Sequence, residues 1–229
     1  EPCLYKQACR QKFVADAIQS GDDWISSELA EQFRKHAKQL EKAFENRLSR
    51  IKANEPLKGS FISSGAEPTP HVEKLIAAAK SVAESGGKAM ILAQGKGKLE
   101  SAKTKFLKLH SPQIIFNSYK SREQLDRLTV QYFDQFDFLV APSHERTNWA
   151  LGLGLPMFIL EPPIGPFAPL NRVVLLQTGV AMSLNSIDEA RGFATRLADL
   201  RKSGHLAKMA ESGWEKYPVN GFQAIAEFL

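Results

Sequence analysis

The richest polar stretch of the sequence, PSHERTN at residues 142–148, directly follows a short apolar stretch. Its hydroxyl, imidazole, carboxylate and guanidinium groups all fall within about two helical turns. His144, Arg146 and Thr147 are suited to contact a diphosphate, whereas Glu145 is suited to hydrogen-bond a sugar hydroxyl. A purely structural role, in which His144 and Asn148 cap the next helix, is the alternative. We favour the binding role for this stretch.

Two earlier loops also follow predicted strands and carry groups suited to anions. In the first loop, Ser64 and Gly65 precede a helix that begins near Thr69, where backbone amides can hold a phosphate. An ordinary connecting turn is an equally good interpretation of so short a signal. The second loop, Gln94–Lys98, contains two lysines but lacks the spacing of a nucleoside triphosphate-binding loop, so we interpret it as a solvated basic loop.

A proline-rich loop, EPPIGPF at residues 161–167, follows the fifth predicted strand. Prolines restrict the backbone, so this loop is predicted to be a stiff, preformed wall of a ligand site. Glu161 and Asn171, the latter on the first turn of the following helix, are candidates for sugar or ribose contacts. Trp149 and Phe167 could line the site or belong to the core, and the core is the favoured place for Trp149.

The elements that must position these loops are six short apolar stretches that alternate with helical periodicity. This alternation predicts an α/β protein with a doubly wound, mostly parallel, six-stranded Rossmann-like sheet. Continuous apolar strands are typical of a sheet covered by helices on both faces. The predicted strands fall within residues 59–65, 89–93, 113–116, 138–141, 157–160 and 180–184.

A long amphipathic helix is predicted ahead of the sheet. Apolar residues recur at steps of three and four between residues 27 and 51, and Asn54-Glu55-Pro56 ends the pattern. We therefore divide the chain into a helical N-terminal segment, residues 1–56, and a Rossmann-like domain, residues 57–229. The segment is interpreted as a linker or packing arm, because about three heptads are few for a coiled coil.

Composition narrows the classes of function. The chain has 229 residues, of which 43% are apolar and 24% charged, as in a folded globular protein. It has two cysteines, no Cys/His cluster and no apolar run long enough for a membrane-spanning helix, which favours a cytoplasmic protein without a metal site or cofactor. It begins at Glu1-Pro2 without Met, which suggests a fragment or a processed chain.

The net charge of +5 is compatible with several anionic partners. Nucleic acid, a membrane surface and a phosphorylated small ligand all attract a basic protein. Lysine and arginine are spread over the chain and no nucleic-acid-binding motif is present, so a phosphorylated small ligand is preferred to nucleic acid. Peripheral membrane contact stays open as an alternative.

The stretch from Asp137 to Asn171 resembles the C-terminal half of GT-B glycosyltransferases. The shared features are a strand that ends in Ala141-Pro142-Ser143, a helix that ends in Gly154-Leu155-Pro156, the strand at 157–160, Pro162, and a loop into Asn171. The resemblance is greatest to the group that makes lipid-linked and natural-product glycosides. It covers about residues 58–229, with Gly-Leu-Pro and its flanks as the most specific part.

The resemblance implies a nucleotide-sugar-binding half of a transferase, with hexosyl or N-acetylhexosaminyl transfer as its reaction. Ser64, Gly65, Ser143, Arg146 and Thr147 then correspond to phosphate-facing positions, and His144 lies beside them. Asn171 matches an asparagine of the family motif. In that family a separate N-terminal domain supplies most acceptor contacts and usually the base. The acceptor and the catalytic residues of this chain are therefore unknown, and a partner domain is expected.

Two positions depart from the family pattern. Trp149 occupies the place of an acidic residue that binds the ribose hydroxyls, and residues 167–170 replace an Asp-Gln pair. Glu145 or Glu161 could substitute for the missing carboxylate. The alternative function is a non-catalytic GT-B-like binding or assembly module that has lost donor recognition. A nicotinamide enzyme is less favoured because no G-x-G-x-x-G follows the first strand.

Overall fold

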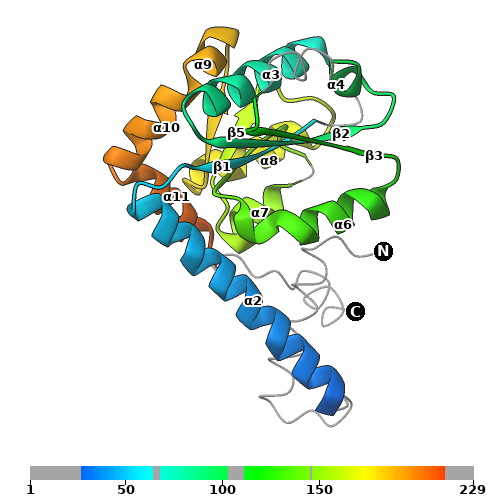
Figure 1. Cartoon of the computed structure of the whole chain (residues 1–229), viewed down its shortest axis with the longest axis vertical. Coiled ribbons are helices and arrows are strands. Elements are labelled where there is room, and N and C mark those ends of the chain that lie inside the picture. Colours follow the sequence, from blue (N-terminus) through cyan, green and yellow to red (C-terminus); the bar gives the residue numbers. More distant parts are fainter. Residues whose placement is uncertain (1–26, 64–67, 103–110, 145, 215–229) are drawn as a thin grey trace.

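A computed structural model describes residues 27–63, 68–102, 111–144 and 146–214 of the chain. Six parallel strands form one sheet in the order β3-β2-β1-β4-β5-β6, which confirms the predicted Rossmann-like sheet (Figure 1). The strands are β1 (Lys58–Ile62), β2 (Lys88–Gln94), β3 (Ile114–Tyr119), β4 (Phe138–Ala141), β5 (Met157–Leu160) and β6 (Ala181–Leu184).

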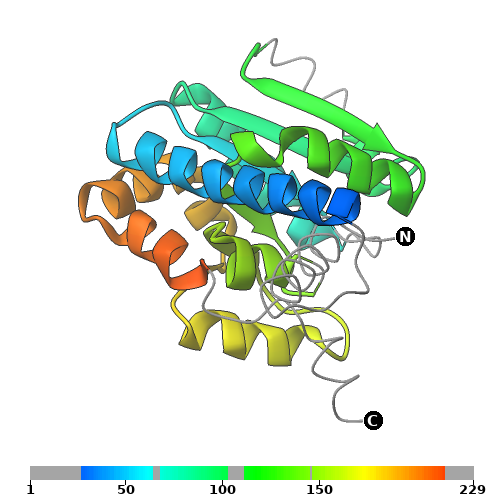
Figure 2. The same cartoon turned by 90° about the horizontal axis from the view of Figure 1, so that it is seen from below.

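Helices cover both faces of this sheet. On one face lie α3 (Thr69–Glu84), α4 (Lys98–Ser101), α9 (Ile187–Arg191) and α10 (Phe193–Lys202). On the other lie α6 (Arg122–Tyr132), the 3₁₀ turn η1 (Phe133–Gln135), α7 (Thr147–Leu153) and α8 (Ala168–Gln177). The long α2 (Ser27–Lys52) runs past one end of the sheet, beside α11 (His205–Gly213) (Figure 2).

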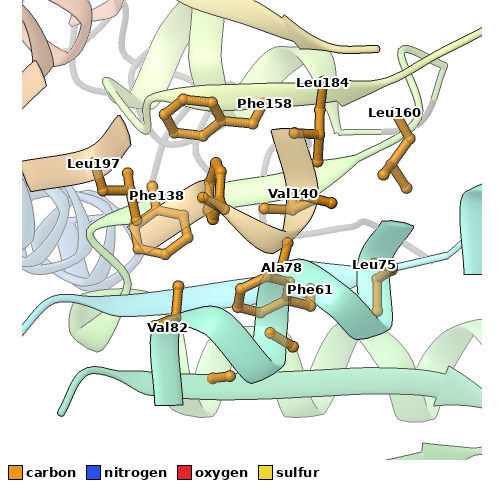
Figure 3. Packing of buried hydrophobic residues seen from close by; sticks show 14 of the residues in the cluster. Phe61, Leu75, Ala78, Val82, Phe138, Val140, Phe158, Leu160, Leu184 and Leu197 are labelled. Atoms are coloured by element: carbon orange, nitrogen blue, oxygen red, sulfur yellow. The ribbon is translucent and has the colours of Figure 1, made fainter. Parts of the chain in front are cut away.

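Aromatic rings fill the core beneath α3 and α10. The Phe138 ring packs edge-to-face on Phe61, with 5.9 Å between centroids, and on Phe158, with 6.0 Å (Figure 3). Phe193 of α10 closes this group at 4.8 Å from Phe158. A Cβ atom at Gly59 would lie 2.3 Å from the Phe138 ring, so only glycine fits at the start of β1. The close approach of β1 and β4 thus depends on this residue.

The C-terminal half of α2 is held by a fully buried arginine. Arg47 donates from Nε to the carbonyl of Phe136 at 2.8 Å and from one terminal nitrogen to the carbonyls of Leu153 and Gly154, both at 2.9 Å. Burial lowers the pKa of the Arg47 guanidinium to about 9, so the group remains charged at neutral pH. The carbonyl oxygens offset the loss of water around that charge.

The end of α2 is fastened by two further charged groups. Asp137 accepts from Arg50 Nε at 2.8 Å and from the Lys58 backbone N–H at 2.8 Å. Burial raises the pKa of Asp137, and the Arg50 cation acts against this rise. Arg201 of α10 donates to the carbonyl oxygens of Ile51 and Arg50. These bonds satisfy carbonyls that the end of a helix leaves without intrahelical partners.

Local signals in the sequence predict several helix boundaries. A Ser followed three residues later by Gln or Glu predicts capping boxes at Ser121 and at Ser186. The structure confirms both caps: Ser121 accepts from the Gln124 N–H at 3.2 Å at the start of α6, and Ser186 accepts from the Glu189 N–H at 3.1 Å at the start of α9. The sequence also predicts one helix from 187 to about 202, and this is wrong, because the residues form two helices, α9 and α10, that meet at Gly192.

We predict that Arg47→Met lowers the free energy of unfolding by about 3 kcal/mol or more, because three buried carbonyl oxygens lose their charged donor. Urea denaturation of the purified chain measures this change. The matched control is Lys42→Met, which places the same side chain at an exposed position of α2. Equal effects of the two substitutions would show that Arg47 does not hold α2 in place.

Candidate functional site

The strand order reverses between β1 and β4. From β1 the chain proceeds outward to β2 and β3, whereas β4, β5 and β6 build the other half of the sheet (Figure 1). The two strands are neighbours in register, with Phe61 opposite Val140. The helices that follow these two strands, α3 and α7, lie on opposite faces of the sheet, and in doubly wound proteins ligands bind at the carboxyl edge where such a divergence occurs. The polar loop after β4 lies at this edge.

The β4–α7 loop is tied down rather than freely solvated. Ser143 is buried, and its hydroxyl donates to the carbonyl of Ala168 at 3.0 Å, which joins this loop to the start of α8. Arg146 is 1% exposed, and its guanidinium carbon lies 4.8 Å from the centre of the Trp149 ring. Trp149 is itself a core residue, as predicted, and packs against Phe133.

The other predicted site residues are spread over three loops. His144 and Thr147 are half-buried, and Thr147 is the first residue of α7. Asn171 lies on the first turn of α8, where its backbone N–H donates to the Phe167 carbonyl at 3.1 Å. Phe167 itself is 70% exposed. Ser64, Gly65 and Glu145 lie outside the described residues, so their roles stay predictions.

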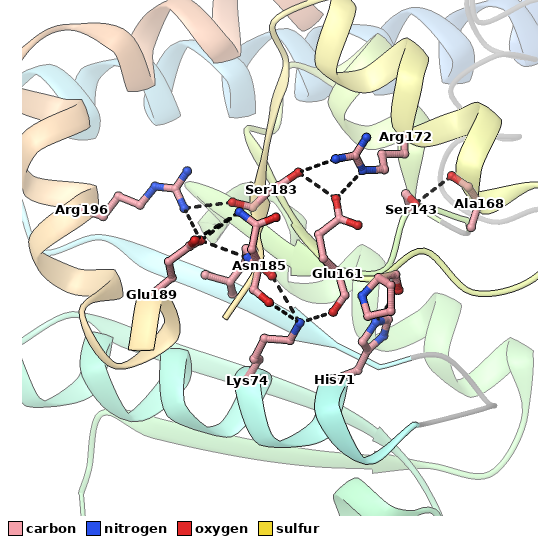
Figure 4. Close-up of polar contacts among 12 residues, drawn as sticks. His71, Lys74, Ser143, Glu161, Ala168, Arg172, Ser183, Asn185, Glu189 and Arg196 are labelled. Atoms are coloured by element: carbon pink, nitrogen blue, oxygen red, sulfur yellow. Dashed lines mark hydrogen bonds and ion pairs between the residues drawn. The ribbon is translucent and has the colours of Figure 1, made fainter. Parts of the chain in front are cut away.

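Glu161 is engaged in a network at the ends of β5 and β6 (Figure 4). Its carboxylate accepts from Ser183 at 2.7 Å and forms an ion pair with Arg172 of α8. The Arg172 guanidinium also donates to the Ser183 hydroxyl at 3.4 Å. These partners direct the carboxylate toward β6 and α8. To contact a ribose or sugar, as predicted, the Glu161 carboxylate has to bind that ligand while it also binds Ser183 and Arg172.

Two buried basic residues of α3, Lys74 and His71, lie at the carboxyl edge of the sheet and contact backbone carbonyl oxygens there. The Lys74 ammonium donates to the carbonyl oxygens of Glu161, Leu184 and Asn185, and so bridges the ends of β5 and β6. His71 Nε2 lies 2.8 Å from the carbonyl of Pro162, in the proline-rich loop. Burial lowers the pKa of Lys74 and also that of His71, and the nearby Lys74 and His144 charges lower the pKa of His71 further.

Neither residue was recognised from the sequence as part of the site. Both stand on the buried face of α3, whose other members are apolar. A charged or titratable residue within an otherwise apolar helical stripe was the available signal, because such groups are rarely buried without a partner. Their partners are backbone carbonyls, however, and these carry no mark in the sequence.

An open groove lies between α3 and α9, away from the carboxyl edge. It is lined by apolar side chains and by charges of both signs, including Glu73, Lys80, Glu84 and Arg191. The mixed charges do not favour an anion over a cation. Among the described residues, no group of three or more His, Cys, Asp or Glu side chains is placed to hold a metal ion. No helix within the described ranges has the length and apolar character to cross a membrane.

Comparison with known proteins gives a match among solved structures. No protein-family model and no curated protein matches the sequence. Among solved structures, the chain is similar to the lipopolysaccharide outer core galactosyltransferase WaaB in its apo form. The match has a TM-score of 0.47 and 15% sequence identity, and covers 77% of this chain and 50% of that chain. The chain thus spans about half the length of this glycosyltransferase.

We predict that acid destabilises the fold partly through His71. Because burial holds the folded-state pKa of His71 below 6.5, the unfolded chain binds more protons in the window below that value. The stability that the neutral ring contributes is therefore lost as the pH falls through this window. Urea denaturation at several pH values should show a smaller acid-induced loss in His71→Gln, whose amide N–H can still donate to Pro162.

The control for this measurement is His205→Gln, a change of the same kind at an exposed position of α11. It should retain the acid-induced loss of the unmodified chain. If His71→Gln and the unmodified chain lose stability in parallel, then His71 is not a buried neutral imidazole.

Proposed function

We propose that this chain is the donor-binding half of a GT-B-like glycosyltransferase, and that it holds the diphosphate of a nucleotide sugar at the carboxyl edge between β1 and β4. The observation that carries the proposal is the reversal of strand order between β1 and β4, because doubly wound proteins bind ligands at the carboxyl edge where the order reverses. The sequence resemblance independently assigns a nucleotide diphosphate to the same loops.

The charge around this edge supports an anionic ligand. His71 and Lys74 approach from α3, and His144 and Arg146 from the β4–α7 loop. Lys98, at the start of α4, donates to the Thr69 hydroxyl at 3.3 Å, so the basic loop after β2 also reaches the N-terminal end of α3. Basic side chains of α3, of the β4–α7 loop and of the start of α4 thus lie at this edge, and the field of those that are charged favours phosphate.

The chemical role of such a site is to stabilise the departing nucleoside diphosphate during sugar transfer. Preorganised donors and positive charge act on the negative charge that develops on this leaving group. Hexosyl or N-acetylhexosaminyl transfer in the cytoplasm without a metal ion is the reaction we propose. The base and the acceptor site belong, in this proposal, to a domain outside the described residues. We expect the present chain to bind a nucleotide sugar without turning it over.

A binding or assembly module that no longer recognises a donor is the second candidate. Three observations favour it. Trp149 lies in the core where the family carries a ribose-binding carboxylate, and Glu161, which could replace that carboxylate, is already engaged by Arg172 and Ser183. The buried position of Arg146 against Trp149 adds weight, since a phosphate contact requires the guanidinium to reach the carboxyl edge.

Calorimetry separates the two candidates. Titration with UDP, GDP, ADP and dTDP sugars should show binding of at least one of them, and Arg146→Ala should weaken it about tenfold or more, because a charge-assisted hydrogen bond is lost. Arg191→Ala, at an exposed arginine of α9, is the matched control and should leave the affinity unchanged. The urea midpoint of each variant verifies its fold.

The absence of binding at millimolar concentrations of all four sugars would contradict donor binding and favour the assembly module. Binding that Arg146→Ala leaves unaltered would remove Arg146 from the phosphate site, while donor binding itself would stand.

A further inference from the structure

His71 carries a buried nitrogen that has no hydrogen-bond partner among the described residues. The side chain is 2% exposed and extends from the first turn of α3 at the carboxyl edge, on the same helix as Lys74 (Figure 4). Nε2 is 2.8 Å from the Pro162 carbonyl, whereas Nδ1 makes no hydrogen bond within the part of the chain that the structure describes. Leaving a buried polar atom without a partner costs about 1–3 kcal/mol, and in native proteins such an atom calls for an explanation.

The contact with Pro162 determines which nitrogen of the neutral His71 ring carries the hydrogen. A carbonyl oxygen only accepts, so Nε2 carries the hydrogen and Nδ1 presents a lone pair. A phosphate oxygen is also an acceptor and cannot pair with that lone pair. If Nδ1 gains a proton, however, the imidazolium donates at both nitrogens, to Pro162 and to the phosphate.

The backbone at this end of α3 supplies few donors of its own. The Pro68 carbonyl takes the N–H groups of both His71 and Val72, and Pro70 has no N–H. A phosphate that approaches this end of the helix therefore depends on side chains. His71 is the side chain of the first turn that is directed toward the loops after β4 and β5.

Burial is the main influence that lowers the pKa of His71, and the charged groups around the ring act on this pKa in both directions. Lys74 on the same helix and His144 on the β4–α7 loop both oppose its protonation, and Glu161 on the β5–α8 side favours it. Together with burial, these groups hold the pKa of His71 below its ordinary value. An added phosphate, which carries negative charge into this environment, shifts the balance toward the imidazolium.

We propose that His71 takes up a proton when a nucleotide sugar binds at the carboxyl edge, and that it donates the new Nδ1–H to a phosphate oxygen. The proton comes from the buffer, and no covalent bond of the ligand changes. This inference rests on the proposed donor site and adds a phosphate-binding residue and a pH dependence to it. Affinity rises by up to about tenfold per pH unit as the pH falls between the pKa values of the bound and free forms.

Calorimetry in two buffers of different ionisation enthalpy, at the same near-neutral pH, tests this proposal. The probes are UDP-glucose, GDP-mannose, ADP-glucose and dTDP-glucose. Their phosphates lack the second ionisation, with a pKa of about 6, of a terminal phosphate, so proton uptake reports on the protein. The unmodified chain should take up a proton, and the uptake should increase as the pH approaches the pKa of the bound form.

His71→Gln should abolish this uptake while it retains the donor to Pro162, and its affinity should become nearly independent of pH. His205→Gln, at an exposed site, should behave like the unmodified chain. His144→Gln should move the uptake to higher pH, because one positive neighbour of His71 is removed. The urea midpoint of each variant near neutral pH verifies that it is folded.

The remaining outcomes contradict the proposal in distinguishable ways. Binding without proton uptake would mean that a ligand hydroxyl or a structural water donates a hydrogen bond to Nδ1. This result would overturn the proposal for His71 and leave the donor site intact. Uptake that persists in a folded His71→Gln would assign the proton to another group. If none of the four nucleotide sugars binds, the donor site itself is wrong and this inference falls with it.

Discussion

Carbonyl oxygens at the carboxyl edge of the sheet need donors, and α3 supplies them from buried basic side chains. Lys74 spans the ends of β5 and β6, and His71 holds the loop after β5. A carbonyl buried without a partner is costly, so the position of α3 along the sheet is set by these contacts as well as by its apolar face. The loops of the candidate site depend on this arrangement. His71 of α3 fixes the loop after β5 directly, and it also lies near His144 of the loop after β4.

At the amino end of β4, buried charged side chains also satisfy backbone groups that would otherwise lack a hydrogen-bond partner. Arg47 from α2 satisfies the carbonyls of Phe136, Leu153 and Gly154, and Asp137 receives the Lys58 N–H at the start of β1. At both ends of the sheet, a buried cation donates hydrogen bonds to carbonyl oxygens that the strands and helices leave unpaired. Burial lowers the pKa of each such cation, and the carbonyl oxygens compensate for the lost hydration.

The architecture followed from local features of the sequence. Continuous apolar strands such as Phe138–Ala141 and Met157–Leu160 are fully buried because helices cover both faces. The Ser121 and Ser186 hydroxyls cap their helices by accepting from a backbone N–H three residues later, so these contacts are local as well. The site was less predictable. Ser143 and Arg146 have the residue types of phosphate ligands, yet the structure ties the first to Ala168 and places the second on Trp149. These contacts join distant segments, and residue type alone does not encode them.

Hydrogen exchange of the full chain, with and without a saturating nucleotide sugar, tests most directly whether the carboxyl edge between β1 and β4 is the ligand site. The account predicts slowed exchange in the loops that follow β1, β4 and β5 and in the first turn of α3. Slowed exchange confined to the α3–α9 groove, around Lys80 and Arg191, would contradict it, as would the same exchange in the presence and absence of ligand.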